Sequence, residues 1–249
     1  MIKLHPLPTV VLNCPYCTVR LDVNGWYMPG MRTLGDLACP ECSRRYYGDL
    51  PVGHGLYAPM LLERPYGVVH NPLGEEAAWY AEWMERSYAA RTSEAPPFNV
   101  EELRPVRKPL VLNCLDPIFG HALHKLLNAQ HYIDHHPDFD LILIIPRIMR
   151  WLVPEGTAAV WMLGGTLSDS GQWNDWLATQ IQKQLAPFDT VYLGAAFSHP
   201  HGRDYDIERF TGVTPFPLDE WVERLEKSTC TFCLGETRLW APVERNLPV

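Results

Sequence analysis

The sequence lacks the hydrophobic segments that would direct it into or across a membrane. In its 249 residues no run approaches the roughly 18 to 20 consecutive apolar residues of a transmembrane helix. The N-terminus carries one lysine and a broken apolar stretch, without the h-region and cleavage site of a signal peptide. We therefore expect a soluble, cytoplasmic protein without membrane partners.

Several motifs of nucleotide-binding and hydrolytic enzymes are also missing. The sequence contains no Gly-x-Gly-x-x-Gly fingerprint of dinucleotide binding and no Gly-x4-Gly-Lys-Ser/Thr phosphate loop. It has no Gly-x-Ser-x-Gly elbow, which argues against an α/β-hydrolase, and no His-Glu-x-x-His metalloprotease motif. The formal net charge of −8 makes nucleic acid an unlikely partner, because general nucleic-acid binders are usually basic.

What the sequence does contain is a globular composition. Hydrophobic residues make up 47% and charged residues 20%, enough apolar material for a substantial core in one large domain or two smaller ones. The 23 prolines divide the chain into short elements, since proline ends helices and interrupts sheet pairing.

Cysteine spacing is the most specific chemical signal. Two Cys-x-x-Cys pairs, Cys14–Cys17 and Cys39–Cys42, are separated by 21 residues, and four thiolates at such spacing form a tetrahedral structural zinc site. The alternative is four buried, reduced cysteines without metal. Redox activity is less favoured, because neither pair opens a helix inside a βαβ unit. The third pair, Cys230 and Cys233, falls in an expected strand, where its role is open.

The residues around the first two pairs predict a small β zinc ribbon over residues 1–58. Val19–Val23 alternates as a strand, Asn24-Gly25 is a hairpin turn signal, and residues 26–28 fit a return strand. Residues 44–49 are expected to add a third strand. This ribbon could bind nucleic acid, dock a protein partner or stabilise a domain that lacks its own core.

Residues 59–108 are expected to connect this ribbon to a second domain. The prolines and glycines of residues 51–72 predict irregular chain, and residues 92–108 predict a linker. A helix is expected over residues 73–91. Its tryptophans, Trp79 and Trp83, lie at helical spacing, which favours packing inside the protein over a platform for stacking sugars.

Residues 109–249 alternate between apolar strands and amphipathic helices. This order predicts an α/β fold: a Rossmann-like, mainly parallel sheet with helices on both faces. The expected strands are residues 110–114, 140–145, 158–163, 190–195 and 230–234, and the expected helices are residues 119–135, 146–152, 172–185 and 217–227.

Polar residues follow several of these strands, where such sheets bind ligands. Asp116 and His121 flank the turn after the first strand, and Gly120 lies at the start of the helix, whose free N–H groups suit an anion or a sugar hydroxyl. Arg147 follows the second strand. The helix histidines at 124, 131 and 135 suggest either metal binding or a solvated face, and the solvated face is the simpler interpretation. Residues 198–206 form a histidine- and aspartate-rich loop, and Cys114 is expected in the core.

The second domain resembles a known family. The segment from Asp116 to Gln130, with the sequence Asp-x-x-Phe-Gly-His-Ala-Leu-His-Lys-Leu-Leu-Asn-Ala-Gln, is followed by the strand 140–145 with Pro146-Arg147 and by Val153-Pro-Glu-Gly. Together they resemble bacterial glycosyltransferase-like proteins of the GT-B, fucosyltransferase-related kind. Thr231-Phe232 and Glu236-x-Arg238-Leu-Trp resemble the segment that opens the nucleotide-sugar-binding half.

The resemblance implies sugar transfer from a nucleotide sugar to a glycan acceptor. Within this hypothesis we predict His121 and Asp116, at the mouth of the sheet, as catalytic residues, and Gly120, Asn128 and Arg147 as substrate-binding residues. The resemblance adds Arg238 as a substrate-binding residue on the donor side. Because the chain ends where the donor-binding half would begin, we expect either an incomplete enzyme or a second chain that completes the cleft. The alternative is a non-catalytic adaptor in which the zinc ribbon docks a protein partner.

Overall fold

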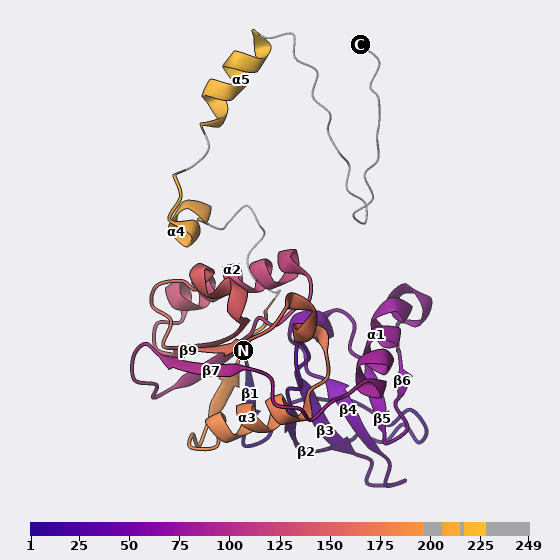
Figure 1. Ribbon diagram of the computed structural model, residues 1–249. Coiled ribbons are helices and arrows are strands. Elements are labelled where there is room, and N and C mark those ends of the chain that lie inside the picture. Colours follow the sequence, from indigo (N-terminus) through magenta and orange to yellow (C-terminus); the bar gives the residue numbers. More distant parts are fainter. Residues whose placement is uncertain (197–205, 215–216, 228–249) are drawn as a thin grey trace, which may run out of the picture. The chain divides into compact units, whose positions relative to one another are not determined.

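The computed structural model describes residues 1–196, 206–214 and 217–227, and divides the chain into two compact units, Met1–Asp206 and Ile207–Val249. The first unit contains both β-sheets of the described chain (Figure 1). Several predictions fall outside the described residues: the strand 230–234 with Cys230 and Cys233, the loop 198–205, and Arg238.

The larger sheet has six strands in the order β1-β11-β8-β9-β10-β7. The four central strands run parallel, while β1 and β7 pair antiparallel at the two edges. The strands are β1 (Ile2–His5), β7 (Phe98–Glu102), β8 (Pro109–Asn113), β9 (Asp140–Pro146), β10 (Ala159–Leu163) and β11 (Val191–Leu193). The prediction of a mixed α/β fold with a parallel-rich sheet is therefore confirmed.

Helices cover both sides of this sheet, which explains why its central strands are mostly apolar. Helix α2 (Phe119–His135) lies on one side and α3 (Asp175–Leu185) on the other (Figure 1). Every residue of β8 and β10 is buried, as expected of parallel strands covered on both faces. After β10 the chain crosses back through α3 and places β11 beside β8, so strand order reverses between β8 and β11.

The smaller sheet has five antiparallel strands in sequence order. They are β2 (Asp22–Tyr27), β3 (Leu34–Ala38), β4 (Arg45–Asp49), β5 (Leu61–Arg64) and β6 (Val68–His70). The predicted hairpin turn at Asn24-Gly25 is wrong, because β2 runs through both residues and the register against β3 shifts between Val23 and Gly25. The reason is that glycine suits a β-bulge as well as it suits a turn.

Two further segments differ from expectation. Residues 51–72 are not irregular throughout, since they contain β5, β6 and the 3₁₀ helix η1 (Gly53–Leu56). Residues 92–108 are not a plain linker, because β7 pairs along all of β10. Edge strands such as β7 keep one side open and carry polar side chains, so their alternation is weak in the sequence.

One hydrophobic core joins the two sheets. It combines Trp26 and Tyr47 of the smaller sheet with Trp161 of the larger sheet and Trp173, all nearly excluded from solvent. The boundary expected at residue 108 therefore falls inside one compact unit. Helix α1 (Ala78–Ala89), preceded by the 3₁₀ helix η2 (Gly74–Ala77), corresponds to the predicted helix 73–91 and buries Tyr80, Met84 and Tyr88.

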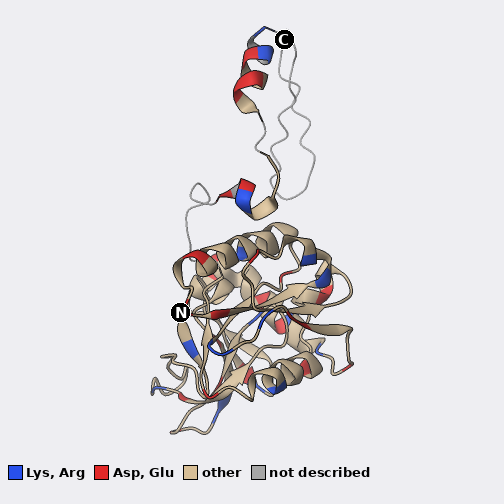
Figure 2. Cartoon of the chain, turned by 90° about the vertical axis from the view of Figure 1, so that its left-hand side faces the viewer, with Lys and Arg blue, Asp and Glu red and all other residues tan. Residues whose placement is uncertain are grey.

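The described part of the second unit consists of α4 (Ile207–Thr211) and α5 (Leu218–Glu226), the latter matching the predicted helix 217–227. In the described chain, no helix combines the length and apolar character that a bilayer crossing requires. The formal net charge of the chain is −8. In Figure 2, Lys and Arg are interspersed with Asp and Glu.

Candidate functional site

The two N-terminal Cys-x-x-Cys pairs form loops of the same shape. In each loop the residue after the second cysteine donates its backbone N–H to the carbonyl of the first: Thr18 to Cys14 at 2.9 Å and Ser43 to Cys39 at 3.0 Å. Both donors have φ of 59°, in the left-handed region. Two loops at different places in the chain thus adopt the same local structure, as the predicted metal site requires.

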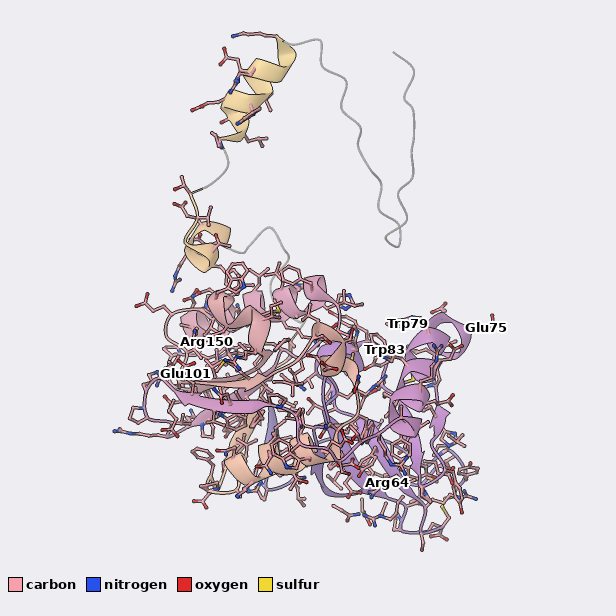
Figure 3. All side chains as sticks on the ribbon, in the orientation of Figure 1. Arg64, Glu75, Trp79, Trp83, Glu101 and Arg150 are labelled. Atoms are coloured by element: carbon pink, nitrogen blue, oxygen red, sulfur yellow. The ribbon has the colours of Figure 1, made fainter. Side chains whose placement is uncertain are left out.

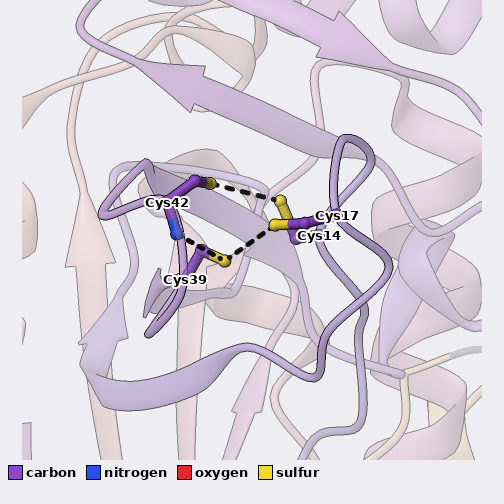
Figure 4. Close-up of side chains that lie close together, drawn as sticks. All are labelled: Cys14, Cys17, Cys39 and Cys42. Carbon is purple, nitrogen blue, oxygen red and sulfur yellow. Dashed lines mark hydrogen bonds between the residues drawn. The ribbon is translucent and has the colours of Figure 1, made fainter.

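The four sulfurs converge on a common centre (Figure 4). The sulfur of Cys14 lies 3.7 Å from that of Cys42, and the sulfur of Cys17 lies 3.4 Å from that of Cys39. A disulfide would bring two sulfurs to about 2.05 Å. Four sulfurs around one ion at about 2.3 Å are separated by roughly 3.8 Å, so the spacing fits one tetrahedral metal ion far better than a disulfide.

The surroundings favour the thiolate, the form that binds metal, at Cys14 and Cys39. Burial raises the pKa of Cys14, but hydrogen bonds from the Tyr46 hydroxyl and from backbone N–H groups outweigh it and lower the pKa to about 6. The backbone N–H of Cys42 points at the sulfur of Cys39 from 3.5 Å and lowers the pKa of Cys39. By contrast, hydrogen bonds with Cys39 and Cys14 raise the pKa of Cys17 to about 12.

The second candidate site lies at the carboxyl end of β8. Asn113, the last residue of that strand, donates from its amide to the carbonyl of Gly30 at 2.9 Å and accepts from the backbone N–H of Leu115 at 3.1 Å. These bonds direct the chain towards Asp116, whose carboxylate accepts from the backbone N–H of Ile118 at 3.0 Å just before α2 begins. Side-chain hydrogen bonds thus hold together the end of β8 and the start of α2.

Three side chains converge on the Asp116 carboxylate. The ammonium nitrogen of Lys125 lies 2.9 Å from it, the Nε2 atom of His54 3.3 Å and the Nδ1 atom of His121 3.4 Å. Asp116 is fully buried and Lys125 is 1% exposed, whereas the His121 side chain is 40% exposed. Burial alone would raise the pKa of Asp116, but Lys125 and the two histidines hold it well below its usual range.

His54 reaches this carboxylate from the smaller sheet. His54 belongs to η1, which packs closely against the chain at the end of β4. A Cβ added to Gly55 would lie only 2.4 Å from the carbonyl oxygen of Leu50, the residue after β4. Only glycine permits so close an approach of two backbones. Burial lowers the pKa of His54 despite its contact with Asp116, which favours the neutral imidazole.

Two groups of residues in the described part of the chain are placed to hold a metal ion: the four cysteines, and His54 with Asp116 and His121. The helix histidines at 124, 131 and 135 do not form such a group. In the second group the single carboxylate is already neutralised by Lys125 at 2.9 Å. A cation there would face that ammonium charge, so the cluster fits proton transfer better than metal binding.

The remaining candidates occupy different positions. Asn128 is buried and donates to the carbonyl of Ala196, beyond β11, at 2.6 Å, so it ties α2 to that strand end. Gly120 lies in the first turn of α2, where an added Cβ would meet open space. Arg147 is exposed in the 3₁₀ helix η3 (Arg147–Leu152), after β9. Cys114 is buried, as expected, and burial raises its pKa to about 12.

Sequence reasoning missed His54 and Lys125. Lys125 carried a signal, because it lies between Ala122 and Ala129 on the buried face of α2, where a charged residue requires a partner. His54 carried none, since its segment was expected to be irregular and its contact with Asp116 spans 62 residues.

Comparisons of the chain with protein-family models, with curated proteins and with solved structures found no match. The resemblance to GT-B glycosyltransferases therefore stays a prediction, and the geometry of the two sites carries the functional argument.

Proposed function

We propose that this protein is a glycosyltransferase-like enzyme in which His121 removes the proton from an acceptor hydroxyl. One observation carries the proposal: a partly exposed imidazole, His121, is backed by a buried carboxylate, Asp116, which Lys125 keeps ionised. A carboxylate behind a histidine orients the ring and fixes which ring nitrogen carries the proton, as in other acid–base sites.

The proposed chemistry follows from this arrangement. The Asp116 carboxylate accepts a hydrogen bond from Nδ1–H of His121, so the proton stays on Nδ1 and Nε2 is free to act as the base. As Nε2 takes the acceptor proton, the acceptor oxygen forms a bond to the anomeric carbon of the donor sugar. The bond from that carbon to the phosphate oxygen breaks, and the nucleoside diphosphate leaves with the electron pair. Lys125 offsets the charge of Asp116 throughout.

The topology supports a Rossmann-like assignment and a ligand at this edge of the sheet. Strand order reverses between β8 and β11, and open α/β sheets bind ligands outside the carboxyl ends of strands at such a reversal. No side chain caps the start of α2, so the N–H groups near Gly120 suit the donor phosphates. Within the described chain, Arg147 is the proposed cationic contact of the donor.

We further propose that Cys14, Cys17, Cys39 and Cys42 hold one structural zinc ion. A set of four thiolates with tetrahedral spacing and backbone N–H donors is typical of structural zinc, and it leaves no open position for a substrate. Zinc here would fix the loops before β2 and β4 to each other.

A direct test measures nucleoside diphosphate release from UDP-, GDP- and dTDP-sugars in the presence of mixed oligosaccharide acceptors. We expect release by the zinc-loaded protein and a loss of about 100-fold or more in His121→Ala. His135→Ala is the matched control, because His135 is exposed on the same helix. Absence of release and of any thermal shift with all donors would overturn the proposal.

A second candidate function is a non-catalytic adaptor. It is favoured by a surface pocket of about 580 Å³ beside the cysteine cluster, lined in part by Arg44, Arg45, Arg64 and the exposed Tyr66. A protein partner captured by wild type and His121→Ala, but lost with Cys39→Ser, would support the adaptor. Capture that is insensitive to Cys39→Ser would count against it.

A further inference from the structure

A second pocket opens between α1 and two loops of the larger sheet. Its volume is about 490 Å³. It is lined by Trp83, Arg86, Ser87 and Ala90 of α1, by Pro117 after β8, and by Ser168, Gly171 and Gln172 of the segment after β10. Pro117, which forms part of its wall, directly follows Asp116 in the chain.

The walls of this pocket are held by close backbone contacts. A Cβ on Gly171 would lie 2.9 Å from the ring of Pro117, so the segment after β10 packs directly on the turn that follows Asp116. On its other side, the carbonyl of Ser170 accepts from the backbone N–H of Met31 at 2.9 Å. The pocket is therefore formed before any ligand arrives, which reduces the ordering cost of binding.

Its chemistry combines one aromatic face with several polar groups. Trp83 contributes a half-buried indole, while Arg86, Ser87, Ser168 and Gln172 contribute donors and acceptors. One helical turn earlier, Trp79 is 54% exposed and its ring lies 6.2 Å from that of His54. Both indoles lie on the side of α1 nearer the larger sheet, with Glu75 on the other side (Figure 3).

We infer that this pocket binds a pyranose ring of the acceptor saccharide, with the ring stacked on Trp83. The inference rests on the proposed function and adds the acceptor-binding subsite to it. A sugar presents an apolar C–H face and a rim of hydroxyls, which matches an indole surrounded by polar side chains. An acceptor seated here extends past Pro117 towards His121, where its next hydroxyl meets the base.

The test separates binding from turnover. Wild type and variants are applied to an array of di- and trisaccharides ending in hexose, N-acetylhexosamine, deoxyhexose or uronic acid. The saccharide bound best by wild type is then titrated by calorimetry. Trp83→Ala and Ser168→Trp are each expected to weaken binding about tenfold or more, the first by removing the stacking face and the second by filling the pocket from an exposed position.

Three variants complete the design. Trp83→Phe keeps an aromatic face and is expected to lose less than about threefold in affinity. Tyr66→Ala removes an exposed aromatic ring that lines the other pocket, and should bind like wild type. His121→Ala should keep binding while losing turnover, so that failure of the catalytic proposal is distinguishable. Binding unchanged by Ser168→Trp, or no saccharide bound by wild type, overturns the subsite.

Discussion

The ammonium nitrogen of Lys125 lies 2.9 Å from the carboxylate of Asp116, and solvent reaches almost no part of either side chain. The same ammonium group donates to the carbonyl of Leu115 at 2.8 Å. This pair fixes the turn between β8 and α2 and keeps Asp116 ionised behind His121. In the proposed function it also keeps the catalytic carboxylate charged.

Replacing Lys125 by methionine should therefore be strongly destabilising. The substitution leaves the Asp116 carboxylate buried without its main cationic partner, which typically costs about 3–5 kcal/mol in the free energy of unfolding. The double variant Lys125→Met/Asp116→Asn removes both charges and should recover part of that loss. Urea denaturation measures both values. A loss below about 1 kcal/mol in the single variant would contradict the importance of the pair.

Metal analysis tests the cysteine cluster. We expect one zinc ion per chain in the wild type, little or none in Cys39→Ser, and one in Cys114→Ala, the control cysteine outside the cluster. Removal of zinc by a chelator should lower the melting temperature, since metal-binding energy contributes to folding. Two ions per chain would instead indicate that the group of His54, Asp116 and His121 also holds metal.

Replacing Ser43 by glycine should stabilise the folded protein. Ser43 has φ of 59°, a conformation that costs a residue with a Cβ about 1 kcal/mol or more and costs glycine little. Because glycine also loses more chain entropy on folding, we expect Ser43→Gly to stabilise the zinc-loaded protein by only about 0.5 kcal/mol. Ser43→Ala keeps the Cβ and should give no gain. Thermal unfolding ranks the three proteins, and a less stable glycine variant would contradict the argument.

Asp140 should contribute stability that depends on pH. Burial raises its pKa, but backbone N–H groups of Lys108 and Arg107, at 2.9 and 2.7 Å, and the ion pair with Arg104 lower it overall. A carboxyl group whose pKa is lower in the folded protein than in the unfolded chain stabilises the fold at pH values above its unfolded-state pKa of about 3.9. That contribution is lost as the pH falls through the folded-state pKa.

Asp140→Asn should consequently lower the free energy of unfolding by about 1 kcal/mol at pH 7, with the difference from wild type shrinking below about pH 4. The control is Asp138→Asn, which removes a carboxyl whose ion pair with Lys108 is exposed to solvent, so stability should change much less. Urea denaturation at several pH values measures both. A stability difference between wild type and Asp140→Asn that grows as the pH falls would contradict the prediction.

Local patterns accounted for most of the regular elements. The helix expected over residues 119–135 was found as Phe119–His135, and the strand expected over residues 140–145 as Asp140–Pro146. Both carry long, consistent hydrophobic patterns, which are the most reliable signal in a single sequence. Strands β1, β5, β6 and β7 were not predicted from the sequence. These strands have only three to five residues, and their formation depends on pairing with partners elsewhere in the chain.

The sequence by itself determined the cysteine cluster and the α/β class, because the spacing of Cys-x-x-Cys pairs and the alternation of strands with helices depend only on neighbouring residues. Only the tertiary structure decided that His54 and Lys125 meet Asp116, and that α1 forms a pocket next to Pro117. Those contacts depend on how η1 and α1 pack against the carboxyl end of β8. That packing is set by the core shared between the two sheets rather than by any local pattern.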